Sequence, residues 1–453
     1  MRGLAVALLL GLVVRLVIFW HTPELGLKIA DEHYFAQLAG NVLHGEGLAS
    51  GPGRPTSIRP PLYPGFVAGI WAVAGDGNLQ AVRAVQIALA LLTAGLVYLL
   101  GRRAFGPAVG RAAAVVTWLY PSLIFLNFTL LTETLFTFFL VGFLLLSVTL
   151  VERPRVSTAI ACGVTLGLGA LTRSVLWPMP LLLCPLLVAL LGGTLKRRLL
   201  LSSAVLLGYS LVVAPWAVRN TRLQGTLTIV DTMGGMNLRM GNYEHTPEDR
   251  MWDAVSLTGE QNWVYALTQE RLEVGGSITE GQKEKWAQRK AIEYMLDNPG
   301  TTLRRAVIKF GDFWGLERSF IAGVRQGLYT PPGWFALLAA AAITLSYVAL
   351  VLPGMAGMWL ARPAWQQHAL LLLPVVTITG VHALVFGHSR YHLPLVPILA
   401  IYAAGLWQQR RAIAWRASRP ALVGASLTLL ALLAAWTRQV TLIDQGRIWA
   451  LFR

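Results

Sequence analysis

The sequence predicts an all-α polytopic membrane protein with about eleven transmembrane helices. Hydrophobic residues make up 55% of the 453 residues and charged residues only 13%, whereas an ordinary soluble domain carries about 25% charged residues. The apolar residues also occur in blocks of about 20, the length that crosses a hydrocarbon layer about 30 Å thick. A chain this apolar could not cover its surface with polar side chains in water. Composition and block length therefore both indicate membrane spans.

The net charge of +16 does not indicate a nucleic-acid-binding protein. The basic residues stand in short clusters between apolar blocks, which is the topology signal of a membrane protein. No basic stripe runs along a soluble module, as nucleic-acid binding requires. Cys162 and Cys184 lie inside apolar blocks, so we expect small buried hydrophobic residues rather than a disulfide.

The predicted spans begin close to the N-terminus. The apolar block 4–20 is longer than a signal-peptide core and no small-residue cleavage site follows it, so we expect it to remain as a helix. Ten further apolar blocks follow. We expect spans at 80–100, 112–128, 131–150, 157–172, 175–194, 199–217, 334–353, 368–386, 393–407 and 420–436.

The basic residues between the spans predict the orientation, with the N-terminus in the cytoplasm. With Met1 inside, the short outside connections contain only Arg173 and Arg390, and the C-terminal tail adds three arginines. Inside connections of membrane proteins carry the excess of lysine and arginine. The inside connections here contain Arg2, Arg102, Arg103, Arg111, Arg153, Arg155, Lys196, Arg197, Arg198, Arg362, Arg410, Arg411, Arg416 and Arg419.

This orientation divides the chain into three regions. Residues 1–217 form an N-terminal transmembrane region with a first external loop at 21–79, and residues 218–333 form an external module. Residues 334–453 form a C-terminal transmembrane region. Apolar residues at helical spacing predict helices in both external segments. No internal repeat is evident, which disfavours a transporter built from duplicated halves.

The sequence Asp31-Glu32-His33-Tyr34 directly follows the first span on the external side. Two adjacent carboxylates there can face a cavity at the membrane surface, where a carboxylate can take a proton from an attacking hydroxyl or orient it. The alternative is that both acids only stabilise the N-terminus of a helix through its dipole. We expect Asp31 to be catalytic, and Glu32 and Tyr34 to contact substrate.

A second motif, Arg59-Pro60-Pro61-Leu62-Tyr63, lies in the same loop. The prolines fix the backbone, and an arginine fork at headgroup depth matches a phosphate. The alternative is an anchor to lipid headgroups, with Tyr63 in the aromatic belt. We expect Arg59 to bind a donor phosphate, with Tyr63 near the substrate.

Glu133 lies at the outside end of the fourth span among apolar neighbours. An ionisable residue at that depth is costly and therefore a functional candidate, although a turn residue exposed to water is the alternative. Lone polar residues such as Arg173, His44 and His382 are expected to be local partners or packing residues.

The sequence His388-Ser389-Arg390-Tyr391-His392 forms the outside turn between the ninth and tenth spans. Its basic and titratable groups suit an anionic headgroup, so we expect Arg390 beside the phosphate and both histidines near the substrate. A plain interfacial turn is the alternative. No acidic partner stands near the histidines in sequence, so no metal site is indicated, and no P-loop or Ser/Cys nucleophile motif is present.

In this order along the chain, the motifs resemble the GT-C superfamily of membrane glycosyltransferases. The most similar branch contains bacterial relatives of the protein O-mannosyltransferases and of the lipid A aminoarabinose transferase. The resemblance covers 4–404. Besides Asp31-Glu32, the Arg59 motif and Thr132-Glu133, it rests on Pro215-Trp216-x-x-Arg219-Asn220, Gly234-Gly235-x-Asn237-Leu238, Gly241-Asn242, Asn298-Pro299-Gly300, Phe313-Trp314 and Arg390-Tyr391-x-Leu393-Pro394.

The resemblance implies an enzyme of the bacterial inner membrane that transfers a sugar from a polyprenyl-phosphate carrier to a lipid, glycan or protein acceptor on the periplasmic side. It implies Asp31 as the catalytic carboxylate, Arg59 as the phosphate ligand, Glu133 as the second acidic position and Arg390 as a further cation. Inversion by a single displacement and no cofactor are also implied, and the partners are the donor, the acceptor and membrane lipids.

Two departures from the aminoarabinose transferases leave the donor headgroup and the acceptor open, so neither aminoarabinose nor lipid A is assigned. Those enzymes place a glutamate where this chain has Ile58, and an arginine soon after the acidic pair, where this chain has His33-Tyr34-Phe35. Two other classes stay open: a flippase or transporter, which needs polar residues deep within several spans, and a polymerase or ligase of lipid-linked glycans, which needs no early Asp31-Glu32.

Overall fold

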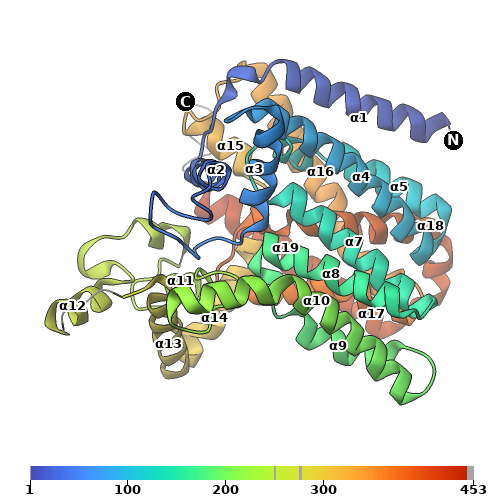
Figure 1. The fold of residues 1–453 in the computed structure, drawn as a ribbon. Coiled ribbons are helices and arrows are strands. Elements are labelled where there is room, and N and C mark those ends of the chain that lie inside the picture. Colours follow the sequence, from blue (N-terminus) through green and yellow to red (C-terminus); the bar gives the residue numbers. More distant parts are fainter. Residues whose placement is uncertain (1, 249–250, 275–277, 446–453) are drawn as a thin grey trace.

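A computed structural model describes residues 2–248, 251–274 and 278–445 of the chain. Helices account for nearly all regular structure in these residues (Figure 1), and the pairing of Ala49 with Pro55 is an isolated bridge outside any strand. The predicted class, an all-helical polytopic membrane protein, is confirmed.

Each expected span lies on helix, but the spans differ from one another in length and continuity. Among the described residues, seven helices are long and apolar enough to cross a membrane: α1, α4, α7, α10, α16, α17 and α19. Pro121 divides the expected span 112–128 into α5 and α6, because its ring cannot continue the preceding helix. The span number of eleven stays a prediction. The bounds are α1 (Arg2–Trp20), α4 (Leu79–Phe105), α5 (Pro107–Leu119), α6 (Pro121–Leu126), α7 (Glu133–Glu152), α8 (Val156–Thr172), α9 (Met179–Leu190), α10 (Leu195–Gln224), α16 (Gly333–Leu360), α17 (Trp365–Leu384), α18 (Val396–Arg416) and α19 (Arg419–Arg438).

Shorter helices build the two expected external segments and the turns beside them. Thr279 caps one of them through its side chain and Gln282 bonds back to Thr279, while Pro299 opens the next in its first turn, where a missing N–H costs nothing. These short elements are η1 (Pro23–Leu25), α2 (Ala30–Leu43), α3 (Leu62–Ala74), η2 (Ser174–Leu176), α11 (Gly234–Met240), η3 (Met251–Ser256), η4 (Gly259–Gln261), α12 (Tyr265–Val274), α13 (Glu280–Asp297), α14 (Pro299–Phe313), α15 (Ser319–Arg325), η5 (Ser389–Leu395) and η6 (Gln439–Ile443).

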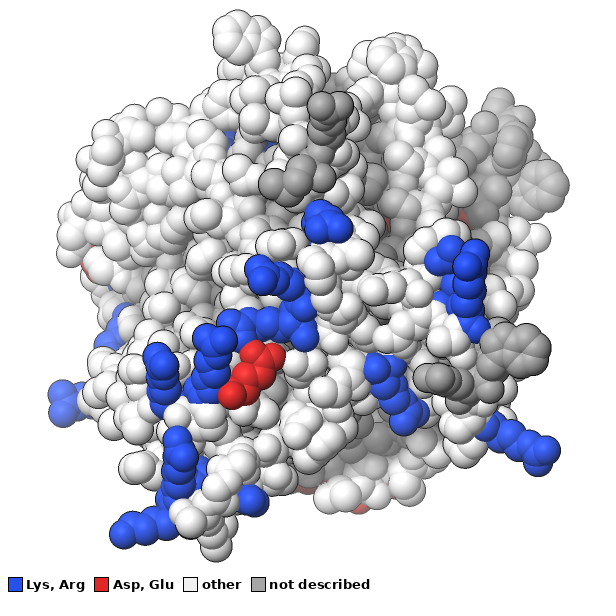
Figure 2. All heavy atoms as spheres, turned by 90° about the vertical axis from the view of Figure 1, so that its right-hand side faces the viewer, with Lys and Arg blue, Asp and Glu red and all other residues white. Residues whose placement is uncertain are grey.

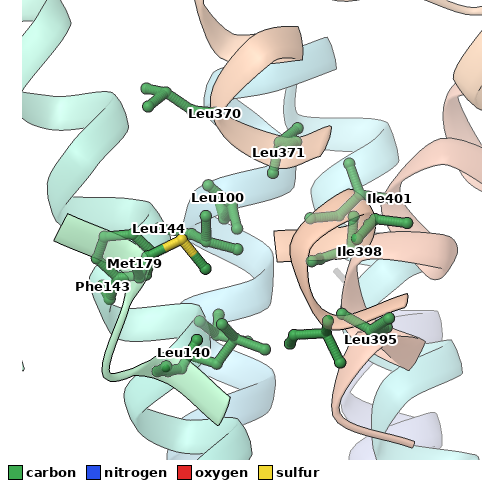
Figure 3. Close-up of a cluster of buried hydrophobic side chains, with 14 of the residues drawn as sticks. Leu100, Leu140, Phe143, Leu144, Met179, Leu370, Leu371, Leu395, Ile398 and Ile401 are labelled. Carbon is green, nitrogen blue, oxygen red and sulfur yellow. The ribbon is translucent and has the colours of Figure 1, made fainter. Parts of the chain in front are cut away.

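The main core lies where α4, α7, α17 and α18 meet. Leu140 and Leu144 of α7 face Leu100 of α4 and Ile398 of α18 across it (Figure 3). Small residues let other helix pairs approach closely: a Cβ on Gly163 of α8 would come within 1.9 Å of the Val205 carbonyl oxygen of α10. Close backbone approach through small residues is characteristic of helix packing in membranes.

One end of the helix bundle is rich in basic residues. Lys and Arg dominate the face formed at the right-hand side of Figure 1, where acidic side chains are few (Figure 2). The Arg103–Glu152 ion pair joins α4 to the C-terminal end of α7. Glu133 begins the same helix at the other end, so the predicted site residues lie away from the Arg103–Glu152 end.

Hydrogen bonds connect the first external loop to the second external segment. Glu280 of α13 accepts hydrogen bonds from the Thr56 hydroxyl and the Ser57 amide, both at 2.7 Å. Arg219 of α10 donates to the Thr56 carbonyl at 2.7 Å and stacks over Trp216. These bonds fix the segment that leads into Arg59.

Candidate functional site

Asp31 lies between two arginines that are distant in sequence. Its two carboxylate oxygens pair with Arg59 at 2.9 Å and with Arg390 at 3.1 Å. Asp31 stands in the first turn of α2, Arg59 precedes the prolines that lead into α3, and Arg390 lies in η5. Three elements therefore bring one acid and two cations together.

Arg390 extends this contact to a second acid. Its Nε lies 3.1 Å from Glu133 Oε1, and Arg173 Nη1 lies 2.9 Å from the same oxygen. The Glu133 side chain is only 1% exposed, and a buried carboxylate is stable only with paired charges. We call Asp31, Arg59, Glu133, Arg173 and Arg390 the arginine–carboxylate cluster.

The arginines of the cluster outnumber the two acids that they hold. Burial raises the pKa of Asp31, but the charges of Arg390 and Arg59 outweigh it and hold that pKa below its usual 3.8. Asp31 therefore stays ionised at neutral pH. The buried Arg59 Nε has no hydrogen-bond acceptor among the described residues.

Local structure fixes each arginine. Pro60 and Pro61 restrict the backbone after Arg59, whose guanidinium lies 5.9 Å from the Tyr34 ring centre. The His388 ring nitrogen accepts from the Arg390 amide at 3.0 Å. Burial lowers the pKa of His388 to about 3, so this ring is neutral and serves as an acceptor.

Two other predicted site residues have structural partners away from the cluster. Glu32 is 3% exposed and accepts from the amides of Lys28, Ile29 and Leu130. Its side chain therefore stabilises the N-terminus of α2, as the alternative interpretation of this acid predicted. Tyr63 is fully buried and donates to Gln86 at 3.1 Å. The structure thus brings neither Glu32 nor Tyr63 into the cluster.

His392 is also fully buried, and it contacts an acid that sequence reasoning did not single out. One ring nitrogen lies 2.6 Å from the Phe313 carbonyl oxygen and the other lies 3.2 Å from Glu317. Glu317 also accepts from the hydroxyls of Tyr120, at 2.6 Å, and Ser122. This network anchors η5, which carries Arg390.

Arg173 and Asp231 are the residues near the cluster that sequence reasoning missed. Arg173 was expected to be a local partner, and it is the direct partner of Glu133. Asp231 follows two β-branched residues in the loop after α10 and lies within electrostatic range of Arg59. A charge embedded in an apolar stretch beside a span is the signal that marks both positions.

Comparisons with known proteins agree with this architecture. Residues 58–218 match the family model "Dolichyl-phosphate-mannose-protein mannosyltransferase". The archaeal oligosaccharyltransferase AglB from Archaeoglobus fulgidus, solved with an inhibitory peptide and a dolichol-phosphate, superposes with a TM-score of 0.51 at 15% identity, covering 95% of this chain and 54% of that chain. Over the aligned part, the chain shares its fold with AglB. The resemblance to the GT-C superfamily expected from the sequence is confirmed.

The fold likeness extends over part of the larger protein only. The chain spans about half the length of the AglB chains it matches, including one in complex with Zn and sulfate (TM-score 0.51, 16% identity, 95% and 52% coverage). ArnT from Cupriavidus metallidurans bound to undecaprenyl phosphate also matches, with a TM-score of 0.39 at 16% identity, over 90% of this chain and 79% of that chain. No curated protein matches the sequence.

Proposed function

We propose that this protein transfers a sugar from a polyprenyl-phosphate carrier to an acceptor hydroxyl at the arginine–carboxylate cluster. The observation that carries the proposal is Asp31 held between Arg59 and Arg390, with Arg390 reaching on to Glu133. In this function Asp31 is the central carboxylate, which positions both arginines and orients the acceptor.

The charge pattern suits a phosphate leaving group. When the bond between sugar and phosphate breaks, negative charge develops on the phosphate oxygen, and preorganised cations stabilise it. Arginine presents a planar fork that matches phosphate oxygens. The Arg59 side chain is partly exposed beside Asp31, and Arg390 provides the second cation of the site.

The distribution of basic residues supports an external site. The face rich in Lys and Arg (Figure 2) is the end of the bundle that a cytoplasmic orientation favours. With that end inside, the cluster faces the periplasmic side of a bacterial inner membrane, where a lipid-linked donor is available within the bilayer.

An apolar cavity supports a lipid carrier. It measures about 700 Å³, and alanines of α5, α16 and α18 line much of it, together with Tyr120 and Trp407. Tyr120 bonds to Glu317, which contacts His392 two residues from Arg390. We propose that this cavity accommodates part of the polyprenyl chain.

Asp31→Asn is the substitution that tests the proposed function. Asparagine keeps the size of the side chain but removes the charge that holds Arg59 and Arg390, so transfer should fall at least about 100-fold, the loss typical of one catalytic group. The measurement is sugar transfer by purified protein in lipid nanodiscs, supplied with polyprenyl-phosphate sugars and a panel of hydroxyl acceptors.

Asp76→Asn is the matched control, because Asp76 is a surface residue that pairs with His44 away from the cluster. It should keep wild-type transfer, and Asp31→Asn should keep wild-type abundance in membranes. Full activity of Asp31→Asn would overturn the role of the cluster. A wild-type protein that uses none of the lipid-phosphate donors would overturn the proposed function.

A further inference from the structure

A buried lysine outside the arginine–carboxylate cluster connects three helices. Lys309 of α14 is 1% exposed. Its Nζ donates to Asn242 Oδ1, just after α11, at 2.8 Å and to the carbonyl of Leu384, the last residue of α17, at 2.9 Å. A buried amine is costly unless it is hydrogen-bonded, and these two bonds join α14 to α11 and α17.

The Gly241-Asn242 motif meets the same end of α17. Asn242 Nδ2 donates to the Leu384 carbonyl at 2.9 Å, beside the Lys309 amine. A Cβ on Gly241 would come within 2.0 Å of the Val385 carbonyl oxygen, so only glycine allows this approach. The last carbonyls of a helix have no partner inside the helix. Lys309 and Asn242 therefore cap the C-terminus of α17.

Helix α14 also contacts the turn after α17 on both sides of Arg390. A Cβ on Gly387, three residues before Arg390, would come within 2.3 Å of the Lys309 carbonyl oxygen. One helical turn along α14, the Phe313 carbonyl oxygen lies 2.6 Å from Nδ1 of His392, two residues after Arg390. The backbone that carries Arg390 is thus held against α14 at both ends.

The Lys309 amine can make its two bonds with or without a positive charge. Burial, and to a smaller extent the charge of Arg305, lowers the pKa of Lys309 to about 7. The ammonium has three N–H donors and the neutral amine has two, which is the number that Asn242 and Leu384 accept. The contact therefore requires the amine rather than its charge.

We propose that Lys309 is a positioning residue for Arg390. Its amine holds the end of α17, and the turn that follows presents the Arg390 guanidinium to the acids of the cluster and to the donor phosphate. Arg390 reaches Asp31 and Glu133 with separate nitrogens, at 3.1 Å each, so a shift of its backbone breaks one contact or both. This inference rests on the proposed function, because Lys309 acts only through the phosphate site.

Lys309→Met tests the role by removing the donor while keeping an unbranched side chain of similar length. In nanodiscs at saturating acceptor, kcat/KM for the polyprenyl-phosphate donor should fall about 10–100-fold, since a displacement of about 1 Å can cost about 100-fold in rate. The KM for the acceptor should stay within a few-fold of the wild-type value. Lys290→Met, at a lysine on the surface of α13 that pairs with Glu293, is the matched control and should keep wild-type kinetics.

Gly387→Ala displaces the same turn without removing the amine. Its methyl group collides with the backbone of Lys309, so the loss in donor kcat/KM should resemble that of Lys309→Met, and this variant provides the comparison if Lys309→Met does not fold. Gly380→Ala is the control, because Gly380 is an exposed position of α17 where an added Cβ meets nothing within 4 Å.

Combination with Arg390→Lys separates positioning from a general loss of stability. If Lys309 acts through Arg390, Lys309→Met should cost less than about three-fold in a protein that already carries Arg390→Lys, because residues that share one contact are not additive. A general loss of stability would instead lower the activity of both backgrounds by the same factor.

Wild-type donor kinetics in Lys309→Met and Gly387→Ala overturn this inference and leave the proposed function intact. Losses that multiply in the double variant assign Lys309 a purely structural role and also overturn the inference. Absence of transfer by the wild type from every lipid-phosphate donor overturns the inference together with the proposed function.

Discussion

At the scale of single residues, each arginine of the cluster has a different task. Arg59 pairs with Asp31. Arg173 neutralises Glu133, and Arg390 alone reaches both acids, through Nη2 to Asp31 and Nε to Glu133. Bridging two carboxylates with separate nitrogens requires the planar guanidinium, which a lysine lacks.

Arg390→Lys should therefore lower transfer although it preserves charge. We expect kcat/KM to fall by about 10²–10³-fold, the loss typical of one missing transition-state donor. The assay is transfer at saturating acceptor with varied donor. Arg54→Lys is a control in the same external loop, at an exposed arginine outside the cluster. Equal activity of Arg390→Lys and wild type would contradict the bridging role.

Sequence reasoning found Asp31, Arg59, Glu133 and Arg390 because charges at the external ends of apolar spans are costly without a function. It placed all four on the same side of the membrane, but it did not pair them. Ion pairing depends on which helices pack together, and that information lies in long-range contacts. Arg173 was missed for the same reason: nothing in its local sequence identifies Glu133 as its partner.

At the scale of secondary-structure elements, buried polar networks hold the short helices that carry the site. The Glu317 carboxylate forms hydrogen bonds with Tyr120, Ser122 and His392. These bonds connect the α5–α6 segment to η5. Glu280 joins α13 to the segment before Arg59. The sequence predicted helices in these segments from their periodicity, but the networks between segments were not visible in it.

Glu317→Gln should destabilise the protein and displace Arg390 indirectly. The glutamine keeps one acceptor oxygen but leaves buried donors without a partner, at a cost of about 1–3 kcal/mol. We expect a lower melting temperature in detergent and a raised KM for the donor. Glu293→Gln, on the exposed side of α13, is the control. Unchanged stability and donor use would contradict the anchoring role of Glu317.

The cavity between α5, α16 and α18 leads to a separate prediction. Ala403→Phe should fill part of it, so the KM for a long-chain polyprenyl donor should rise several-fold more than the KM for a short-chain analogue. The measurement is donor KM as a function of chain length. Leu427→Phe, at a position of α19 that is 62% exposed, should leave both values unchanged. A uniform change for both donors would argue against a lipid site in the cavity.

At the scale of the whole molecule, the bundle has one basic end and one end that carries the cluster. Composition and apolar blocks predicted the fold class without any relative, because the bilayer admits few solutions for backbone hydrogen bonding. The number of crossings was harder to predict, since Pro121 divides one block and α8 and α9 are shorter than a full span.

Labelling of single cysteines tests the orientation of the molecule. In a background without Cys162 and Cys184, Glu46→Cys in the first external loop should react with a membrane-impermeant maleimide in intact spheroplasts. Lys196→Cys, in the first turn of α10, should react only after permeabilisation. Both positions are exposed, so accessibility to the reagent reports the side of the membrane. The opposite pattern would place the cluster in the cytoplasm.

The most direct measurement of the central claim is the stoichiometry of the reaction at the cluster. Purified protein should release one polyprenyl monophosphate for each sugar that appears on the acceptor, as followed by mass spectrometry of both products. Arg59→Ala should lower this coupled yield at limiting donor more than at saturating donor, because it weakens the phosphate contact. Sugar transfer without release of polyprenyl monophosphate, or an Arg59→Ala variant with unchanged donor dependence, would contradict the account.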